Sequence, residues 1–526
     1  MAATTPRPST DGWRDGRCPA HTEAGKSAAG SGRAVWGEVL ADHAFGTDAA
    51  APGRRIVGLA AGAAAFAAIL LAPDFGPSPQ VKPVAAVTAL MAIWWMLEAA
   101  PLAATALLPL VLFPALGVAD VGEAAAPYAD PVIFLFLGGF VLGAAMERSG
   151  LHKRVGLACA AAAGATPRRL VAGMLGATAF LSMWISNSAT AVMMAPVAMA
   201  VLALAEAHGG RDDPAAHRNL GVALLLSVAY GASIGGLATL IGTPPNALLA
   251  GYMAREHGVE IGFAQWMLVG APVALVLLVA AWFVLTTLFP SRLALPDARV
   301  LFREERTRLG RMSGAERRVA AVFALAAAAW ITRPLLSPYA PWLSDTGIAI
   351  AAAVLMAILP AAGLRSERLV TETELKRLPW EVLTLFGGGL SLAAAISGSG
   401  LAAWLGELLG ALGGLPAAAM IVAVTLAMIF LTELTSNTAS AATFLPIGGA
   451  LALAMGVDPM FLAIPLALAA SCAFMLPVAT PPNAIVYGGG LITVGQMSRA
   501  GLWLNLIGVA VISAAALVIA PVVFGR

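Results

Sequence analysis

Two short polar motifs interrupt apolar stretches of this chain, and their residue types suit the binding of small ions. Ser186-Asn187-Ser188 lies in one stretch, and Ser436-Asn437-Thr438 lies in another, 250 residues later. Serine, threonine and asparagine offer neutral hydroxyl and amide oxygens together with O–H and N–H donors. The oxygens suit a hard alkali cation, and the donors can bind a carboxylate. The two motifs are therefore candidate sites for a cation, an anion or both.

A second pair of motifs follows the first and should break helices. Thr243-Pro244-Pro245-Asn246 is matched by Thr480-Pro481-Pro482-Asn483, 237 residues later. Proline removes an amide donor and clashes with the preceding turn, so two in succession open a helix and free carbonyl groups. Gly242 allows a ligand to approach the backbone closely, and its counterpart is Ala479. Freed carbonyls attract cations, and the N-terminus of the next helix attracts anions.

Duplication separates these motifs from ordinary packing features. A single Ser-Asn pair would most simply hydrogen-bond between transmembrane helices, and a single Pro-Pro would be a kink. The 250-residue offset, however, also pairs Phe136, Gly138 and Gly139 with Phe386, Gly388 and Gly389, and Ser149-Gly150-Leu151 with Ser399-Gly400-Leu401. Repeated helix-breaking motifs in apolar sequence are typical of secondary transporters built from structural repeats.

The composition indicates an all-α polytopic membrane protein. Of 526 residues, 59% are hydrophobic and 11% are charged, whereas soluble domains carry roughly 25% charged residues. The apolar runs are continuous rather than alternating, which argues against a β-barrel. Net charge +2 and three scattered cysteines indicate neither nucleic-acid binding nor a disulfide framework. We expect a disordered cytoplasmic tail over 1–53 and a transporter domain over 54–526, with repeats at about 83–290 and 319–523.

The elements that position the motifs can be placed by hydropathy and length. Two apolar stretches, about 171–203 and 415–455, hold the Ser-Asn motifs near their middles. Each arm is about a dozen residues, short of the roughly 20 that a spanning helix needs, which predicts two re-entrant hairpins with the motifs at their tips. We expect eleven crossings near 56–73, 83–99, 101–118, 131–147, 220–252, 265–290, 319–336, 345–363, 381–398, 462–490 and 502–523.

Charges in the loops predict the orientation. Arginine and lysine gather in 148–169, in 291–318, which has eight arginines, and in 364–377, whereas 119–130 holds acidic residues and no base. Basic loops lie in the cytoplasm, and all three do so if both hairpins re-enter. This topology puts the N-terminus in the cytoplasm and the C-terminus outside, and makes the halves an inverted repeat whose hairpin tips meet at a central site.

One acidic residue near the second motif needs an explanation. Glu433 lies three residues before Ser436, and the matching residue in the first half is Met183. A carboxyl group at membrane depth is a candidate functional group. It is either a proton or cation ligand or a structural hydrogen-bonding residue, and we favour the structural role.

The doubled motifs resemble the signature regions of the divalent anion:sodium symporter family, of the sodium/dicarboxylate cotransporter type. The similarity covers Ser182 to Pro196, Gly231 to Asn246, Thr432 to Pro446 and Ser471 to Tyr487, within a match from about residue 56 to the C-terminus. The resemblance implies a homodimer in the plasma membrane whose transport domain moves by an elevator-like slide. It also implies transport of C4 dicarboxylates such as succinate, malate or fumarate, coupled to sodium.

The resemblance further implies specific binding residues. One sodium ion would bind Ser182, Ser186, Asn187 and the carbonyl of Gly242, and a second would bind Thr432, Thr435, Asn437 and the carbonyl of Ala479. The two carboxylates of the substrate would bind two sets of residues that partly overlap the sodium sites. One set is Ser186, Asn187, Ser188 and Thr243, and the other is Ser436, Asn437, Thr438 and Thr480.

One departure and several alternatives remain. The first motif ends in Ser188 where the family pattern has threonine. Serine keeps the hydroxyl group of threonine and lacks its methyl group. A sodium-independent dicarboxylate exchanger, or the same fold carrying sulfate or citrate, fits the same residue types. A membrane-embedded enzyme would need a titratable constellation at the site, and a channel would need a continuous lined pore. We therefore expect a transporter rather than an enzyme.

Overall fold

The computed structural model describes residues 52–162, 164, 166–206, 213–293, 303–304, 307–363, 366–408 and 416–525, all within the unit Gly46–Arg526. Their regular structure is helical, apart from one isolated bridge between Pro360 and Arg368. The expected all-α class is confirmed. The predicted tail, 1–53, lies outside the described residues except for its last two, which begin α2 (Pro52–Leu71).

The helices of the first half follow the predicted order. After α2 come α3 (Val81–Met96), α4 (Leu102–Ala106), α5 (Leu108–Ala115), α6 (Val121–Ala125), η1 (Ala126–Ala129), α7 (Pro131–Ser149), α8 (Leu151–Ala162), α9 (Pro167–Ser182), α10 (Asn187–Ala205), α11 (Pro214–Gly236), α12 (Pro244–His257) and α13 (Phe263–Leu288). The predicted crossing at 101–118 is interrupted, because α4 and α5 meet at Leu107.

The second half runs from α15 to α25. It comprises α15 (Gly314–Leu336), α16 (Asp345–Ile358), α17 (Glu372–Lys376), α18 (Trp380–Ser399), α19 (Leu401–Leu408), α20 (Ala417–Thr432), α21 (Asn437–Ala454), α22 (Met460–Ala470), η4 (Pro477–Ala479), α23 (Pro481–Gly488), α24 (Val494–Ala514), the π-helical η5 (Ala515–Ile519) and α25 (Ala520–Phe524). By length and composition, seven helices of the described residues can cross a membrane, and several shorter apolar helices accompany them.

The two predicted hairpins are present as helix–turn–helix pairs, but their arms are longer than expected. Hairpin 1 (α9 and α10) has arms of 16 and 19 residues, and hairpin 2 (α20 and α21) has arms of 16 and 18 residues. The estimate of about a dozen residues was wrong. Apolar helices continue until a residue caps them, and α9, for example, begins only where Thr166 caps its first turn.

Matching motifs build matching local structure in the two halves. Gly150 and Gly400 have φ of +79° and +82°, a left-handed conformation that glycine adopts without steric cost. The preceding serine hydroxyl in each copy accepts a hydrogen bond from the following leucine amide, at 3.4 Å for Ser149 and 3.3 Å for Ser399. Both Ser-Gly-Leu motifs therefore end one long helix and start a short one.

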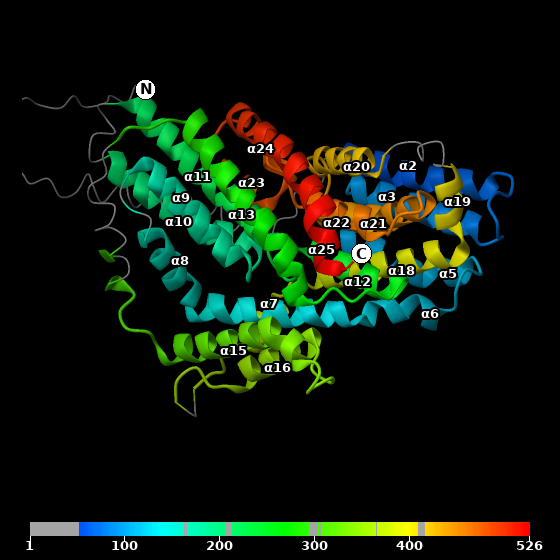
Figure 1. The fold of residues 1–526 in the computed structure, drawn as a ribbon, viewed down its shortest axis with the longest axis horizontal. Helices are drawn as coiled ribbons and strands as arrows, with labels where there is room; N and C mark the ends of the chain where they lie inside the picture. Colours follow the sequence, from blue (N-terminus) through cyan, green and yellow to red (C-terminus); the bar gives the residue numbers. More distant parts are fainter. Residues whose placement is uncertain are drawn as a thin grey trace, which may run out of the picture. The chain divides into compact units, whose positions relative to one another are not determined.

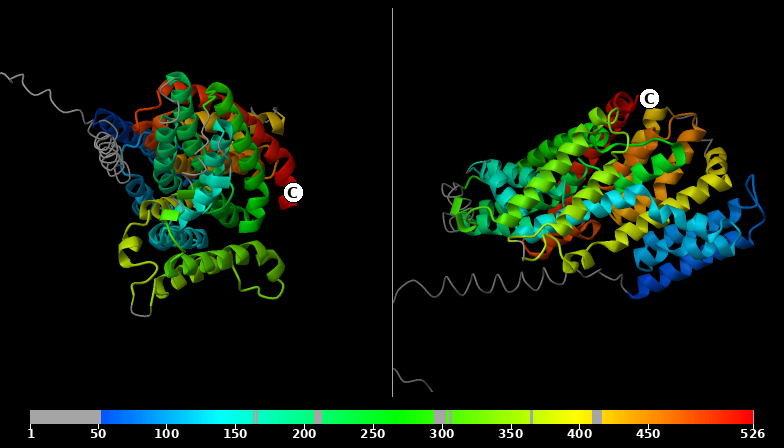
Figure 2. Two further views of the ribbon diagram at one scale, coloured as in Figure 1. Left: turned by 90° about the vertical axis from the view of Figure 1, so that its left-hand side faces the viewer. Right: turned by 90° about the horizontal axis from the view of Figure 1, so that it is seen from below.

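The paired phenylalanines bring the halves together. The rings of Phe136 in α7 and Phe386 in α18 lie 5.1 Å apart in an edge-to-face contact. Figure 1 shows α7 running across the view, with α15 and α16 packed along it. Hairpin 1 packs against α11, and hairpin 2 packs against α22. Figure 2 shows the same ribbon from two other directions.

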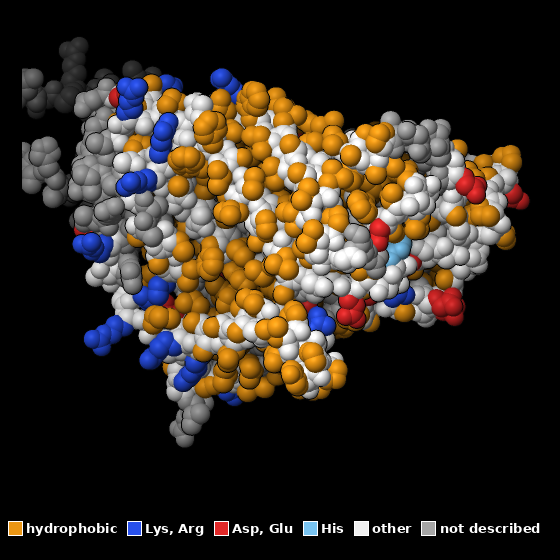
Figure 3. Space-filling view, in the orientation of Figure 1, with side chains coloured by type: hydrophobic (Ala, Val, Ile, Leu, Met, Phe, Trp, Pro, Cys, Tyr) orange, Lys and Arg blue, Asp and Glu red, His pale blue; other side chains and the backbone are white. Residues whose placement is uncertain are grey.

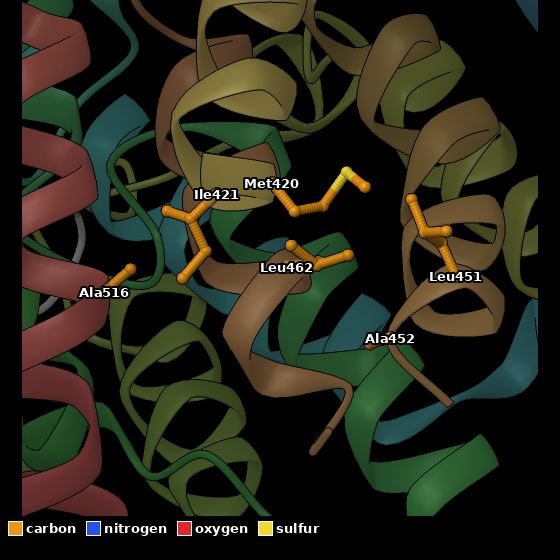
Figure 4. Packing of buried hydrophobic residues seen from close by; sticks show 6 residues of the cluster. All are labelled: Met420, Ile421, Leu451, Ala452, Leu462 and Ala516. Carbon is orange, nitrogen blue, oxygen red and sulfur yellow. The ribbon is translucent and has the colours of Figure 1, made fainter. Parts of the chain in front are cut away.

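A small apolar cluster holds hairpin 2 against its neighbours. Met420 and Ile421 of α20 pack with Leu462 of α22, and residues of α21 and η5 complete the cluster (Figure 4). These side chains are at most 8% exposed. Burial of this kind stabilises the packing by roughly 25 cal/mol per Å² of apolar surface.

The three basic loops converge on one another. Arg148 at the end of α7 pairs with Glu367, in the loop after α16, and with Glu374 of α17. Arg154 in α8 pairs with Glu316 at the start of α15, with 2.9 Å from Nε to Oε1. On the face seen in Figure 3, lysine and arginine gather at the left side and acidic residues at the right. The loops assigned to the cytoplasm thus lie at one end of the helices.

One carboxyl group of this end is strongly perturbed. Burial raises the pKa of Glu374, but hydrogen bonds from Thr371 and the charge of Arg148 outweigh burial and lower the pKa to about 2. The ionised carboxylate is thus favoured in the folded state. The contact between α7 and α17 is therefore strongest at pH values above the ordinary pKa of glutamate.

Candidate functional site

The tip of hairpin 1 is the turn between α9 and α10. Ser186 caps α10, and its hydroxyl accepts a hydrogen bond from the amide of Ala189 at 3.2 Å. Asn187 is the first residue of α10. In the amide orientation that satisfies both polar atoms, its nitrogen donates to the carbonyls of Ala232 (3.2 Å) and Gly242 (3.3 Å) and to Ser182 Oγ (2.6 Å). The tip is therefore bound to the residues around the first Pro-Pro motif.

The tip of hairpin 2 has a similar design. Asn437 is the first residue of α21, and its Oδ1 accepts a hydrogen bond from Thr432 Oγ1 at 2.7 Å. The same hydroxyl lies 2.9 Å from the carbonyl of Ala470, the last residue of α22. Thr435 lies close by, but its hydroxyl pairs with Ser440 at 2.7 Å and with the Leu431 carbonyl at 2.9 Å.

The first Pro-Pro motif breaks the predicted crossing at 220–252. We call residues 237–243, between α11 and α12, break 1. Asn246 Nδ2 donates back across it to the carbonyls of Gly236 (3.1 Å) and Thr239 (2.8 Å). A Cβ at Gly242 would lie 2.4 Å from the Gly236 carbonyl oxygen, so this close approach requires glycine. Asn246 therefore ties the start of α12 to the end of α11 across break 1.

The second Pro-Pro motif breaks the crossing at 462–490 in the same way. We call residues 471–480, between α22 and α23, break 2. Asn483 Nδ2 donates to the carbonyls of Ala473 (3.1 Å) and Leu476 (3.0 Å). These acceptors stand 237 residues after Gly236 and Thr239, the offset of the motifs themselves. The two asparagines therefore do the same work in the two halves.

The two halves meet at the breaks. Thr243 of break 1 and Ser471 of break 2 share a buried hydrogen bond of 3.2 Å between their hydroxyl oxygens. In addition, α10 of hairpin 1 packs against α23, and α21 of hairpin 2 packs against α12. Each hairpin thus contacts the broken helix of the other half, and the two motif pairs form one region.

Burial divides the predicted site residues into two groups. Ser182, Gly242, Thr432, Thr435 and Ala479, assigned to cations, are buried. Ser186 is exposed, and the tip residues Asn187, Ser188, Ser436, Asn437 and Thr438 are half-buried. Buried oxygens suit a dehydrated cation, and accessible hydroxyls and amides suit a ligand that enters from water. Thr243 and Thr480, assigned to substrate, are instead buried, at 2% and 5% exposure.

Not every predicted residue joins its group. Hydrogen bonds connect Ser182, Asn187 and Gly242 around the first predicted cation site. Around the second they connect Thr432 and Asn437, whereas the bonds found among the described residues leave Ala479 apart from this pair. Ser471 was missed, because an isolated serine in an apolar run carries no sequence signal of its own.

Comparison with known proteins agrees with the motifs. The model of the sodium:sulfate symporter transmembrane region matches residues 54–524. The chain belongs to this sodium:sulfate symporter family. Its relatives include the sodium-dependent dicarboxylate transporter SdcS of Staphylococcus saprophyticus, 42% identical over 480 residues, covering 90% of this chain and 92% of that protein. The SdcS of Staphylococcus aureus strain USA300 is 42% identical over 453 residues, covering 84% and 86%.

Among solved structures, the crystal structure of the YdaH transporter of Alcanivorax borkumensis matches 82% of this chain and 98% of its own, with a TM-score of 0.49 and 15% identity.

Family membership settles the class of the protein. The family and its relatives are transporters, so this symporter-family member is a multi-pass membrane transporter and not an enzyme. The resemblance predicted from the doubled motifs is confirmed.

Proposed function

We propose that the chain is a sodium-coupled symporter of C4 dicarboxylates such as succinate, malate or fumarate. The observation that carries the proposal is that each hairpin packs against the broken helix of the other half. Thr243 of break 1 and Ser471 of break 2 join the two halves there by a hydrogen bond. Relatives at 42% identity are named sodium-dependent dicarboxylate transporters. Two neutral polar motifs suit a small molecule with an anionic group at each end.

The proposed binding roles are those that the family resemblance implies. One sodium ion would bind Ser182, Ser186, Asn187 and the Gly242 carbonyl, and the other would bind Thr432, Thr435, Asn437 and the Ala479 carbonyl. The accessible tip hydroxyls and amides would take the two carboxylates, with Thr243 and Thr480 behind them. The predicted site residues include no arginine or lysine. The charge of the substrate is therefore offset by the cations and by the N-termini of α10 and α21, which couples anion binding to cation binding.

The transport mechanism and assembly belong to the same proposal. A transport domain with both hairpins and both breaks would slide within a homodimer, with the basic loops and N-terminus in the cytoplasm and the C-terminus outside. The convergence of the three basic loops at one end supports this orientation.

Uptake of labelled succinate into proteoliposomes tests the proposal. Vesicles are empty or preloaded with succinate, and sodium, potassium or choline is supplied outside. A symporter takes up succinate into empty vesicles only with sodium. Uptake that ignores sodium and requires internal succinate would show an exchanger instead, and competition by sulfate or citrate tests the alternative substrates.

A further inference from the structure

A buried acidic residue, Glu433, links the tip of hairpin 2 to break 2. Glu433 directly follows Thr432 at the end of α20, and it is 3% exposed. Its Oε1 accepts hydrogen bonds from the amides of Phe474 (2.7 Å) and Met475 (2.9 Å), and its Oε2 from the amide of Leu476 (3.0 Å). Asn505 of α24 donates to Oε1 at 2.7 Å. Because all four partners donate, the geometry fits the ionised, acceptor-only form of the side chain.

Break 2 needs these acceptors because its backbone is unwound. Within the described residues, the amides of Phe474, Met475 and Leu476 form no backbone–backbone hydrogen bond. Buried amides without partners are costly. The carboxylate therefore replaces the helical acceptors that this segment has lost.

The carbonyls of the same segment are held from other elements. Ala473 O accepts from Asn483 Nδ2 (3.1 Å), Phe474 O from Tyr230 Oη (3.0 Å) and Met475 O from Ser498 Oγ (3.0 Å). Tyr230 belongs to α11 of the first half. With both sides of these peptide groups bonded, the position of break 2 follows that of the Glu433 side chain.

The first half lacks an equivalent charge. Met183 stands at the position that matches Glu433, and its backbone carbonyl accepts a hydrogen bond from Thr239 Oγ1 at 2.5 Å. In break 1, the amides of Leu237 and Ala238 keep helix-type bonds to Ile234 and Gly235. Two of the three matching amides in break 1 thus have backbone partners, and the two halves of the site differ.

We propose that Glu433 is a positioning residue for the second cation site, an inference that rests on the proposed function. It fixes break 2 relative to Thr432, and so positions the hydroxyl of the hairpin and the Ala479 carbonyl for one shared ion. Its four partners are neutral, so its negative charge also favours a cation nearby. The second site therefore depends on a fixed charge that the first site does not have.

Sodium titrations of purified, reconstituted variants test this role. Glu433→Gln keeps the shape of the side chain but removes the charge and one of the two acceptor oxygens. We expect the sodium concentration for half-maximal succinate uptake to rise at least tenfold, and the sodium-induced rise in melting temperature to shift to the same higher concentrations. Met183→Leu, which changes only the side chain at the matching position, should leave the half-saturating sodium concentration unchanged.

The outcomes separate the two proposals. A Glu433→Gln protein with reduced maximal uptake but the sodium half-saturation of the wild type would overturn the positioning role and leave the symporter proposal intact. A wild-type protein without any sodium effect would defeat the proposed function and this inference with it. Where Glu433→Gln does not fold, Glu433→Asp replaces it. Aspartate keeps the charge but reaches fewer amides, so an unchanged half-saturation in a folded Asp variant would also contradict the role.

Discussion

Replacing Asn246 tests how break 1 is held together. The side chain is fully buried, and its Nδ2 faces three carbonyl oxygens, those of Gly236, Leu237 and Thr239, at 3.1, 3.4 and 2.8 Å. Leu237 O keeps a second donor, the indole of Trp266 at 3.0 Å. The carbonyl of Thr239 likewise keeps a second donor, the amide of Gly242 at 3.4 Å. Asn246→Ala therefore leaves one carbonyl, that of Gly236, without a partner among the described residues, whereas Asn246→Asp places an oxygen among three oxygens.

The magnitude follows from the number of orphaned acceptors. One orphaned acceptor costs about 1–3 kcal/mol, so Asn246→Ala should lose about 1–3 kcal/mol of folding free energy. Asn246→Asp has nearly the size and shape of asparagine, yet it should be the less stable variant. It adds repulsion between its own oxygens and the carbonyl dipoles to the loss of the donor.

Thermal unfolding in detergent, paired with succinate uptake, gives the comparison. We expect melting temperatures in the order wild type, Asn246→Ala, Asn246→Asp, with no uptake by the Asp variant. Asn483→Ala and Asn483→Asp should repeat the order, because Asn483 makes the matching bonds across break 2. An Asp variant as stable as the Ala variant would refute the stated orientation of the amide and its role in closing the break.

Three further predictions concern the site and the basic end. Asn187→Ala and Asn437→Ala should each abolish succinate uptake while the protein still elutes as a folded species, and normal uptake by either would remove its motif from the site. Gly242→Ala should reduce uptake strongly, because its Cβ would lie 2.4 Å from a backbone oxygen; full activity would show that the close approach is dispensable. Because the pKa of Glu374 is lowered from 4.5 to about 2, its stabilising contribution is present above about pH 4.5 and is lost as pH falls toward 2. The melting temperature of Arg148→Ala should therefore fall less on acidification than that of the wild type. An equal fall would contradict the pairing of Arg148 with Glu374.

Local chemistry accounts for what the sequence could predict. The breaks occur where proline pairs stand, and both hairpin tips occur at Ser-Asn motifs, because these residues end or cap helices wherever they lie. The offset of 250 residues also anticipated that Ser149-Gly150-Leu151 and Ser399-Gly400-Leu401 would have the same role. These features depend on only a few neighbouring residues.

Contacts between residues far apart in the chain account for what the sequence could not predict. The backbone partners of Glu433 lie 41 to 43 residues away in the chain and Asn505 lies 72 away, and Thr243 meets Ser471 across 228 residues. Neither contact leaves a periodic pattern, since each depends on how several helices pack. The arms of the hairpins were underestimated for a related reason. Hydropathy marks where apolar sequence lies, but capping residues decide where a helix begins.

Uphill movement of substrate tests the central claim, the coupling of dicarboxylate transport to sodium, most directly. Proteoliposomes are loaded with labelled succinate at equal concentration inside and outside, and a sodium gradient is then imposed in one direction or the other. Our account predicts net accumulation of succinate under an inward sodium gradient and net loss under an outward one. Succinate that stays at equal concentration under both gradients, in vesicles that still exchange label, would contradict sodium coupling.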